Sequence, residues 1–264
     1  MKAGVSCFFL NFMKTIFCFG FVLFLINTPV FCEQNGSDSS NHDSMPTSAL
    51  RLTARLHNMG LFSYGGRLVS SHPVMDINMT YARKNWGIQV FKAQDMVESR
   101  NPINFTLAVI NKDFQVGKRL TITPSVGILL EQFESIADHG SDAVIIVNTT
   151  YKLGRRIILD HSTLFGNLIL EPELTDWVNR LRLTYSKDHF DISLMTWHNN
   201  SIFDSVNYAT AGTSIFYSRM KLGKMSTLNA GVTGILMTHT SNETELPRWN
   251  GIFLTMGVNY TKQN

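Results

Sequence analysis

The stretch IFLTMGVNYT, residues 252–261, has side chains whose character repeats every two residues. Apolar or aromatic side chains occupy every even position, and the odd positions after Phe253 are small or polar. Because successive side chains in a strand point to opposite faces, the stretch predicts a β-strand with one apolar face. About ten residues is also the length that a tilted strand needs to cross a bilayer.

The same period of two continues back to residue 49. It is clear in the alternation of Leu50, Leu52, Ala54 and Leu56 with polar residues, and it recurs in 73–83, 119–130 and 142–153. Twelve strands are predicted in all, at residues 49–58, 73–83, 86–94, 103–112, 119–130, 142–153, 156–166, 175–186, 189–198, 206–219, 225–239 and 249–261.

The connections between these segments alternate in length. Short turns are expected near 84–85, 113–118, 154–155, 187–188 and 220–224, and longer polar loops near 95–102, 131–141, 167–174, 199–205 and 240–248. Short turns on one side of a membrane and longer loops on the other are typical of outer-membrane barrels. Both chain ends lie on the turn side only if the number of strands is even, so 49–58 is the twelfth. The expected fold is all-β: a transmembrane, antiparallel, up-and-down β-barrel over residues 49–264.

The composition agrees with a membrane barrel. Only 16% of the 264 residues are charged, against about 25% in an average soluble domain. After residue 32 no apolar run approaches the roughly 18 residues of a spanning helix. The net charge of +3 is small and scattered, so nucleic acid is not expected as a partner.

Residues 1–32 are interpreted as a cleaved signal peptide. Lys14 precedes an apolar run from Ile16 to Ile26, and cleavage after Cys32 would follow. Met13 is an alternative start to Met1, and a membrane anchor or a lipid attached to Cys32 are alternatives to cleavage. All three cysteines lie in this segment, so the mature chain would contain no thiol. Residues 33–48 are polar and are expected to form a disordered periplasmic tail.

In this architecture the chain resembles the outer-membrane β-barrel proteins of Gram-negative bacteria, among their small uncharacterised members. The resemblance implies export to the outer membrane, contact with outer-membrane lipids and lipopolysaccharide, and insertion by the barrel-assembly machinery. One departure is that the chain ends in Lys262-Gln263-Asn264, where such barrels usually end in an aromatic residue.

Parity along the strands places eight charged side chains in the lumen. They are Arg51, Arg55, Asp76, Lys152, Asp160, Arg180, Arg182 and Asp191. Opposite charges in a narrow lumen would pair, so one interpretation is a stabilising salt-bridge network. The other is a small pore that weakly prefers anions. The expected function is a non-catalytic barrel, either a small pore or a structural or partner-binding barrel.

One motif leaves an enzyme open as the alternative. His239-Thr240-Ser241-Asn242, followed by Asn250, resembles the His-x-Ser-Asn motif of the outer-membrane phospholipases A and the lipid A 3-O-deacylases. That resemblance implies Ser241 as nucleophile, His239 as general base, and Asn250 or Glu243 as the residue that orients the imidazole. Calcium would be a cofactor only under this alternative, and no other cofactor is expected.

Three features of the motif argue against catalysis. Asn250 follows Ser241 by a shorter gap than in those families, and Phe253 stands near the expected place. Parity on 225–239 also predicts that His239 faces the lumen, away from lipid.

His198 and Asp204 could contribute to a metal site, but two residues are an incomplete ligand set, so no metal site is expected.

Overall fold

The computed structural model describes residues 48–62, 66–97, 104–129, 143–166, 168, 176–201, 206–244 and 246–263. The predicted signal peptide and nearly all of the predicted tail lie outside these ranges. Every regular element among the described residues is a β-strand. None of these residues belongs to a helix long and apolar enough to cross a membrane.

Twelve strands form one closed antiparallel barrel, because β6 pairs with β5 on one side and with β8 on the other. β7 continues β6 after an interruption at Asp113 and pairs with the same neighbour, β8. The wall strands are β1 (Ser48–His57), β4 (Val74–Arg83), β5 (Trp86–Asp95), β6 (Asn104–Lys112) with β7 (Phe114–Val116), β8 (Leu120–Leu129), β9 (Ala143–Lys152), β10 (Ile157–Gly166), β11 (Asp176–Lys187), β12 (Phe190–Ser201), β13 (Asn207–Lys221), β14 (Ser226–Thr240) and β15 (Asn250–Gln263). The predicted fold class is confirmed, and each predicted strand matches a wall strand to within a few residues.

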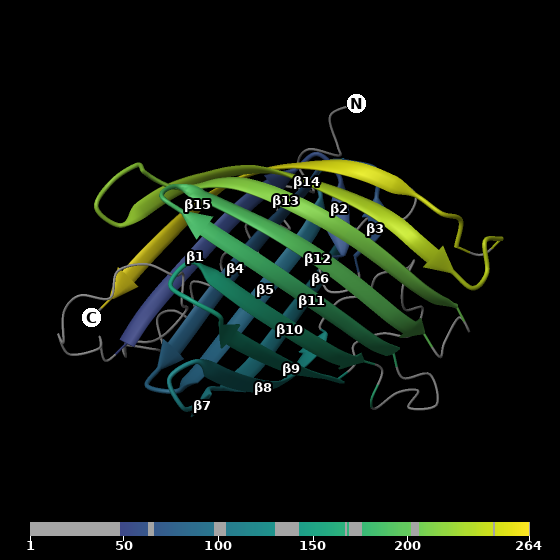
Figure 1. Cartoon of the computed structure of the whole chain (residues 1–264). Coiled ribbons are helices and arrows are strands. Elements are labelled where there is room, and N and C mark those ends of the chain that lie inside the picture. The colour runs from purple at the N-terminus through teal and green to yellow at the C-terminus, as the bar shows by residue number, and fades with distance from the viewer. Residues whose placement is uncertain are drawn as a thin grey trace.

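The barrel has two unlike ends. At the turn end, where β1 begins and β15 finishes, neighbouring strands are joined by short connections such as 84–85, 188–189 and 222–225. At the loop end the connections are longer, including those between β1 and β4 and between β14 and β15. β13, β14 and β15 have 14 or 15 residues, whereas most strands from β1 to β10 have 10. Figure 1 shows these long strands sweeping over one side of the barrel.

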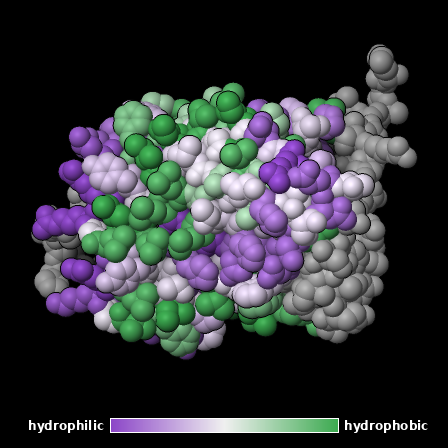
Figure 2. Space-filling model, turned by 45° about the vertical axis from the view of Figure 1, so that its right-hand side comes forward, coloured by the Kyte–Doolittle hydropathy of each residue, from purple (hydrophilic) through white to green (hydrophobic). Residues whose placement is uncertain are grey.

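The outer face is apolar, as the period of two predicts. On β15 the side chains of Ile252, Leu254, Met256 and Val258 are 40–64% exposed, whereas Phe253 between them is 2% exposed. Figure 2 shows hydrophobic side chains spread over the outside of the strands, with hydrophilic side chains gathered at the left-hand end of the molecule and in a second group on its right half. Aromatic side chains are exposed near the turn end, including Trp86, Tyr151, Tyr185, Phe190 and Tyr217. An apolar belt with aromatic residues at its border is the outer surface of a membrane barrel.

Two further strands lie within the connection from β1 to β4. β2 (Gly60–Phe62) and β3 (Arg67–Ser70) pair only with each other, as a small antiparallel hairpin. The sequence pattern did not predict them. Figure 1 draws this hairpin toward the loop end, behind the long strands β13 and β14.

Candidate functional site

Part of the lumen is lined by polar side chains that bond to one another, and one such cluster lies near the loop ends of β1 and β4. Asp76 on β4 is 5% exposed and accepts hydrogen bonds from two residues of β1, its cross-strand partner Arg55 and the nearby His57. Arg55 Nε lies 2.8 Å from Asp76 Oδ1, and His57 Nε2 lies 2.7 Å from Asp76 Oδ2. The other ring nitrogen of His57 lies 2.9 Å from Thr255 Oγ1 on β15. This cluster ties β4, β1 and β15 together across the first and last strands of the barrel.

Two more ion pairs lie further round the wall. Arg182 on β11 donates to Asp160 on β10 at 3.0 Å, and Thr150 on β9 donates to the second oxygen of that carboxylate at 2.8 Å. Arg219 on β13 donates to Asp191 on β12 at 3.1 Å. These ion pairs hold charged side chains in fixed positions on the inner face of the barrel.

The structure places all eight lumen residues of the sequence analysis on the inner face. Arg55 meets Asp76 and Arg182 meets Asp160, whereas Asp191 bonds Arg219, which the sequence pattern did not select. Arg51, Lys152 and Arg180 complete the set on β1, β9 and β11. Arg219 has an odd position on β13 and would face lipid by parity. A bulge between Tyr217 and Met220, with a φ of 67° at Arg219, turns it inward, and no residue type in that stretch signals the bulge.

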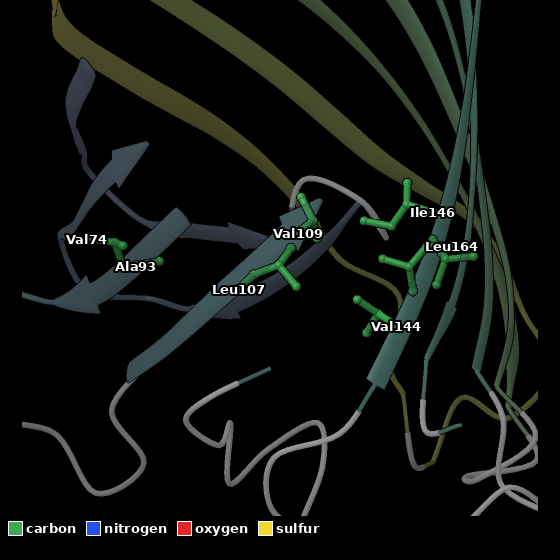
Figure 3. Close-up of a cluster of buried hydrophobic side chains, with 8 residues drawn as sticks. Val74, Ala93, Leu107, Val109, Val144, Ile146 and Leu164 are labelled. Carbon is green, nitrogen blue, oxygen red and sulfur yellow. The ribbon is translucent and has the colours of Figure 1, made fainter. Parts of the chain in front are cut away.

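Other parts of the inner face are apolar, with a few buried polar side chains such as Asp95 and Asn199 beside them. The largest apolar cluster has eight buried side chains on the inner faces of six strands: Val74, Ala93, Leu107, Val109, Val144, Ile146, Leu164 and Val178. Figure 3 shows Leu107 and Val109 on β6, with Val74 and Ala93 to one side and Val144, Ile146 and Leu164 to the other. A second apolar cluster of Trp197, Ile235 and Phe253 comes from β12, β14 and β15.

The β2–β3 hairpin occupies the space between these two walls. Leu68 on β3 packs against the cluster of Trp197, and its neighbour Val69 packs against the cluster of Ile146. Consecutive side chains of a strand point in opposite directions, so β3 crosses the lumen with both of its faces packed. We call residues 58–73, of which the structure describes 58–62 and 66–73, the plug segment.

Gly66 brings the plug segment into direct contact with the wall. Its φ is +62°, and a β-carbon there would lie 2.5 Å from Trp197 Cδ2 and overlap the hydroxyl of Thr210. Glycine is therefore required twice, for the left-handed backbone and for the close approach. At the start of the plug segment, Asn58 bonds to β15, donating its backbone N–H to Leu254 O at 3.1 Å and accepting the N–H of Leu254 on its side-chain oxygen at 2.7 Å.

The connection between β14 and β15 adds a further apolar contact at the loop end. Leu246 is 8% exposed and packs in a cluster with Val206, Tyr208 and Met237, and Trp249 is packed against this cluster. Trp249 also lies edge-on to Phe253, with ring centroids 6.1 Å apart. The loop end of the lumen is thus lined by apolar and aromatic side chains and filled by the chain's own segments.

The predicted orientation of His239 is wrong. The pairing of β13 with β14 shifts by one residue, since Thr210 pairs with Met237 and Ala209 with His239, which leaves Thr238 as a bulge. Met237 before the bulge is 2% exposed in the lumen, and His239 after it is exposed on the outer face. A one-residue bulge reverses parity, so the orientation argument against the esterase motif does not hold.

The motif is nevertheless not assembled as a catalytic triad. Ser241 Oγ accepts the backbone N–H of Asn207 at 2.8 Å, and among the described residues no hydrogen bond joins it to His239. Glu243 pairs with Arg248 at 2.7 Å, and Asn250 is exposed. Asp204 lies outside the described residues, and within them no three His, Cys, Asp or Glu side chains are grouped as metal ligands.

Comparison with known proteins shows the fold without a close relative. No protein-family model and no curated protein sequence matches the chain. Among solved structures, the KdgM porin superposes with a TM-score of 0.52 at 8% identity, over 80% of this chain and 98% of that one. The NanC porin gives a TM-score of 0.52 at 9% identity, over 79% and 98%. An outer membrane channel from Pseudomonas putida F1 gives 0.54 at 8% identity, over 86% and 100%. At these identities the likeness shows a shared barrel fold.

Proposed function

We propose that the protein is a channel of the outer membrane of a Gram-negative bacterium, and that its own plug segment closes it in the state described. The apolar outer belt supports residence in a membrane, and the likeness to porins and a channel supports the choice of a pore over a purely structural barrel. The loop end would face the outside and the turn end the periplasm, as in barrels of this architecture.

The observation that carries the proposal is the way in which the lumen is filled. Barrels of about eight strands are filled by their wall side chains, and barrels of 16 or more leave a channel. This barrel, with twelve strands, fills its loop half with a separate hairpin that crosses the lumen. A wall that needed only to be rigid would not require an inserted strand with one packed apolar side chain on each face.

The plug segment can also move out of the lumen without breaking the pairing of the wall strands. Its ends join His57 on β1 to Val74 on β4, and these two residues are cross-strand partners. The β1–β4 ladder therefore closes just below the plug segment and does not depend on it. Movement of a loop on such anchors is a common way for a channel to open.

Single-channel recording in planar bilayers tests the proposal. The alanine of Gly66→Ala would collide with Trp197 and Thr210, so we expect long open steps where the parent protein shows rare ones. The matched control is Gly117→Ala: Gly117 has a φ of +66° but no neighbour within 4 Å of an added β-carbon. The Gly117→Ala variant has the same backbone strain but no collision with a neighbouring side chain, so it should conduct like the parent protein.

A cysteine pair supplies the opposite test. A β-carbon at Gly66 would meet the Thr210 side chain, so Gly66→Cys with Thr210→Cys brings two thiols into reach of a disulfide. Oxidation should hold the channel shut, and reduction should release it. A third variant replaces residues 60–71 by a four-residue Gly-Ser linker. The proposal fails if all three proteins fold but none conducts current: Gly66→Ala, the reduced cysteine pair and the linker variant.

A further inference from the structure

The boundary between the two halves of the lumen has the chemistry of a binding site. On β11 the successive inward positions are Val178, Arg180 and Arg182, so the last apolar side chain and the first cation are about 7 Å apart along the strand. On β10 the matching positions are Leu164, Ser162 and Asp160. The lumen therefore changes from apolar to charged within one step of the pleat.

Ser162 at this boundary is buried without a partner. The residue is 2% exposed, and no hydrogen bond to its hydroxyl is formed among the described residues. Its cross-strand neighbours are Arg180 on β11 and Asn148 on β9. A buried hydroxyl without a partner loses the free energy of a hydrogen bond, and a water molecule or an ion can complete such a group.

An aromatic side chain lies beside this polar group, and aliphatic side chains lie one pleat step toward the loop end. Arg180 is the cross-strand partner of Trp197, and Leu164 is the partner of both Ile146 and Val178. An anionic group at Ser162 and Arg180 would leave the rest of its molecule against these apolar side chains. Val69 of the plug segment packs against the apolar cluster that contains Leu164, Ile146 and Val178.

Charge on the inner wall favours an anion over a cation. Among the described side chains, the inward cations of the wall are Arg51, Arg55, Lys152, Arg180, Arg182, Arg219 and Lys221, and the inward anions are Asp76, Asp95, Asp113, Asp160 and Asp191. An excess of positive charge in a narrow polar zone raises the local concentration of anions.

We propose that the boundary at Ser162, Arg180 and Trp197 binds small organic anions with an apolar body, and that these are the solutes the channel admits. The inference rests on the proposed channel for its transport part only. The anionic oxygens would accept hydrogen bonds from the Ser162 hydroxyl and the Arg180 guanidinium. The apolar body would occupy the space that Val69 covers while the plug segment is in place.

Benzenesulfonate is a suitable probe, because it is anionic at every usable pH and does not cross lipid in a neutral form. In bilayers containing the Gly66→Ala protein, we expect it to interrupt the chloride current at lower concentration than either of two controls. Methanesulfonate has the anionic group without the ring, and benzyltrimethylammonium has the ring with the opposite charge. Equal interruption by all three would overturn the inference while leaving the channel itself intact.

Titration calorimetry of the same protein in a zwitterionic detergent gives a readout that needs no conduction. Ser162→Ala should weaken benzenesulfonate binding roughly tenfold, the typical effect of losing one hydrogen bond to a charged group. Ser214→Ala, at another buried lumen serine on β13, should leave it unchanged. If Ser162→Ala weakens binding and Ser214→Ala does not, but no variant conducts current, the binding site is supported and the channel is refuted. Equal affinity for Ser162→Ala and its parent would refute the site.

Discussion

An arginine on the outer face measures whether that face lies in lipid or in water. Val126 on β8 has an outward side chain that is 59% exposed. If the outer face were in water, Val126→Arg would replace one exposed side chain by another and change the free energy of unfolding by no more than about 0.5 kcal/mol. If the face lies in a membrane, the same substitution places a charge in hydrocarbon.

The depth of Val126 sets the size of the expected loss. It lies six residues from Leu120, the first residue of β8 at the turn end. At about 3.3 Å per residue and a tilt of about 40°, six residues rise roughly 15 Å, near the middle of an apolar band about 25 Å tall. An arginine near the midplane of such a barrel costs about 2–4 kcal/mol. We therefore expect Val126→Arg to lower the free energy of unfolding by that amount in a urea titration with lipid vesicles.

Two control variants separate depth from other costs. Ile157, the first residue of β10, is also outward and 38% exposed, but it lies at the turn end, so Ile157→Arg should cost about 0–1 kcal/mol. Thr53→Arg tests the lumen, because Thr53 faces the polar half between Asn78 and Asn259. The neighbouring Ser125 is not a fair comparison, since it is 5% exposed and paired with Ile146 in the apolar half. A loss for Val126→Arg no greater than that for Ile157→Arg would refute residence of this face in a membrane.

Two further predictions concern orientation and catalysis. With single cysteines at Ser135, in a predicted loop outside the described residues, and at Lys187, at the turn end, a membrane-impermeant thiol reagent on intact cells should label only position 135; labelling only at 187 would invert the barrel. Phospholipid and lipid A hydrolysis by the purified protein should stay at background with and without calcium and be unchanged by Ser241→Ala, because Ser241 bonds Asn207 and not His239. Activity above background that both Ser241→Ala and His239→Ala abolish would establish an esterase.

The lipid-facing surface of the barrel could be predicted because lipid favours apolar side chains there. Most outward positions across the bilayer must be apolar, although His161 and Thr149 are exceptions here, so the period of two persists along strands such as β8 and β15. The even strand count and the alternation of turns with loops follow from crossing a membrane repeatedly. For the same reason the ion-pair partners Arg55 and Asp76 could be assigned to the inner face from parity alone.

A β-bulge makes the assignment of faces from alternation wrong, because one extra residue shifts the alternation for every residue after it. Thr238 on β14 and Arg219 on β13 each shift the register once, and each reverses the faces of the residues that follow. Neither position carries a glycine or proline that would mark it. The orientation of His239 and the role of Arg219 at Asp191 were therefore beyond sequence reasoning, although the strands that carry them were not.

The apolar loop half of the lumen was visible in the sequence only as a blurred pattern. Ile235 and Met237 are apolar at inward positions, so β14 looks apolar on both faces toward its loop end. A lumen filled with water would not select such residues, and they must be covered by some part of the molecule. The connection from β1 to β4 contains apolar residues at Leu68 and Val69, which an exposed loop would not require either. Each feature is unexplained alone, and together they require that the connection fold inward. A barrel with apolar inward residues at one end and an apolar long loop at that same end therefore predicts its own plug.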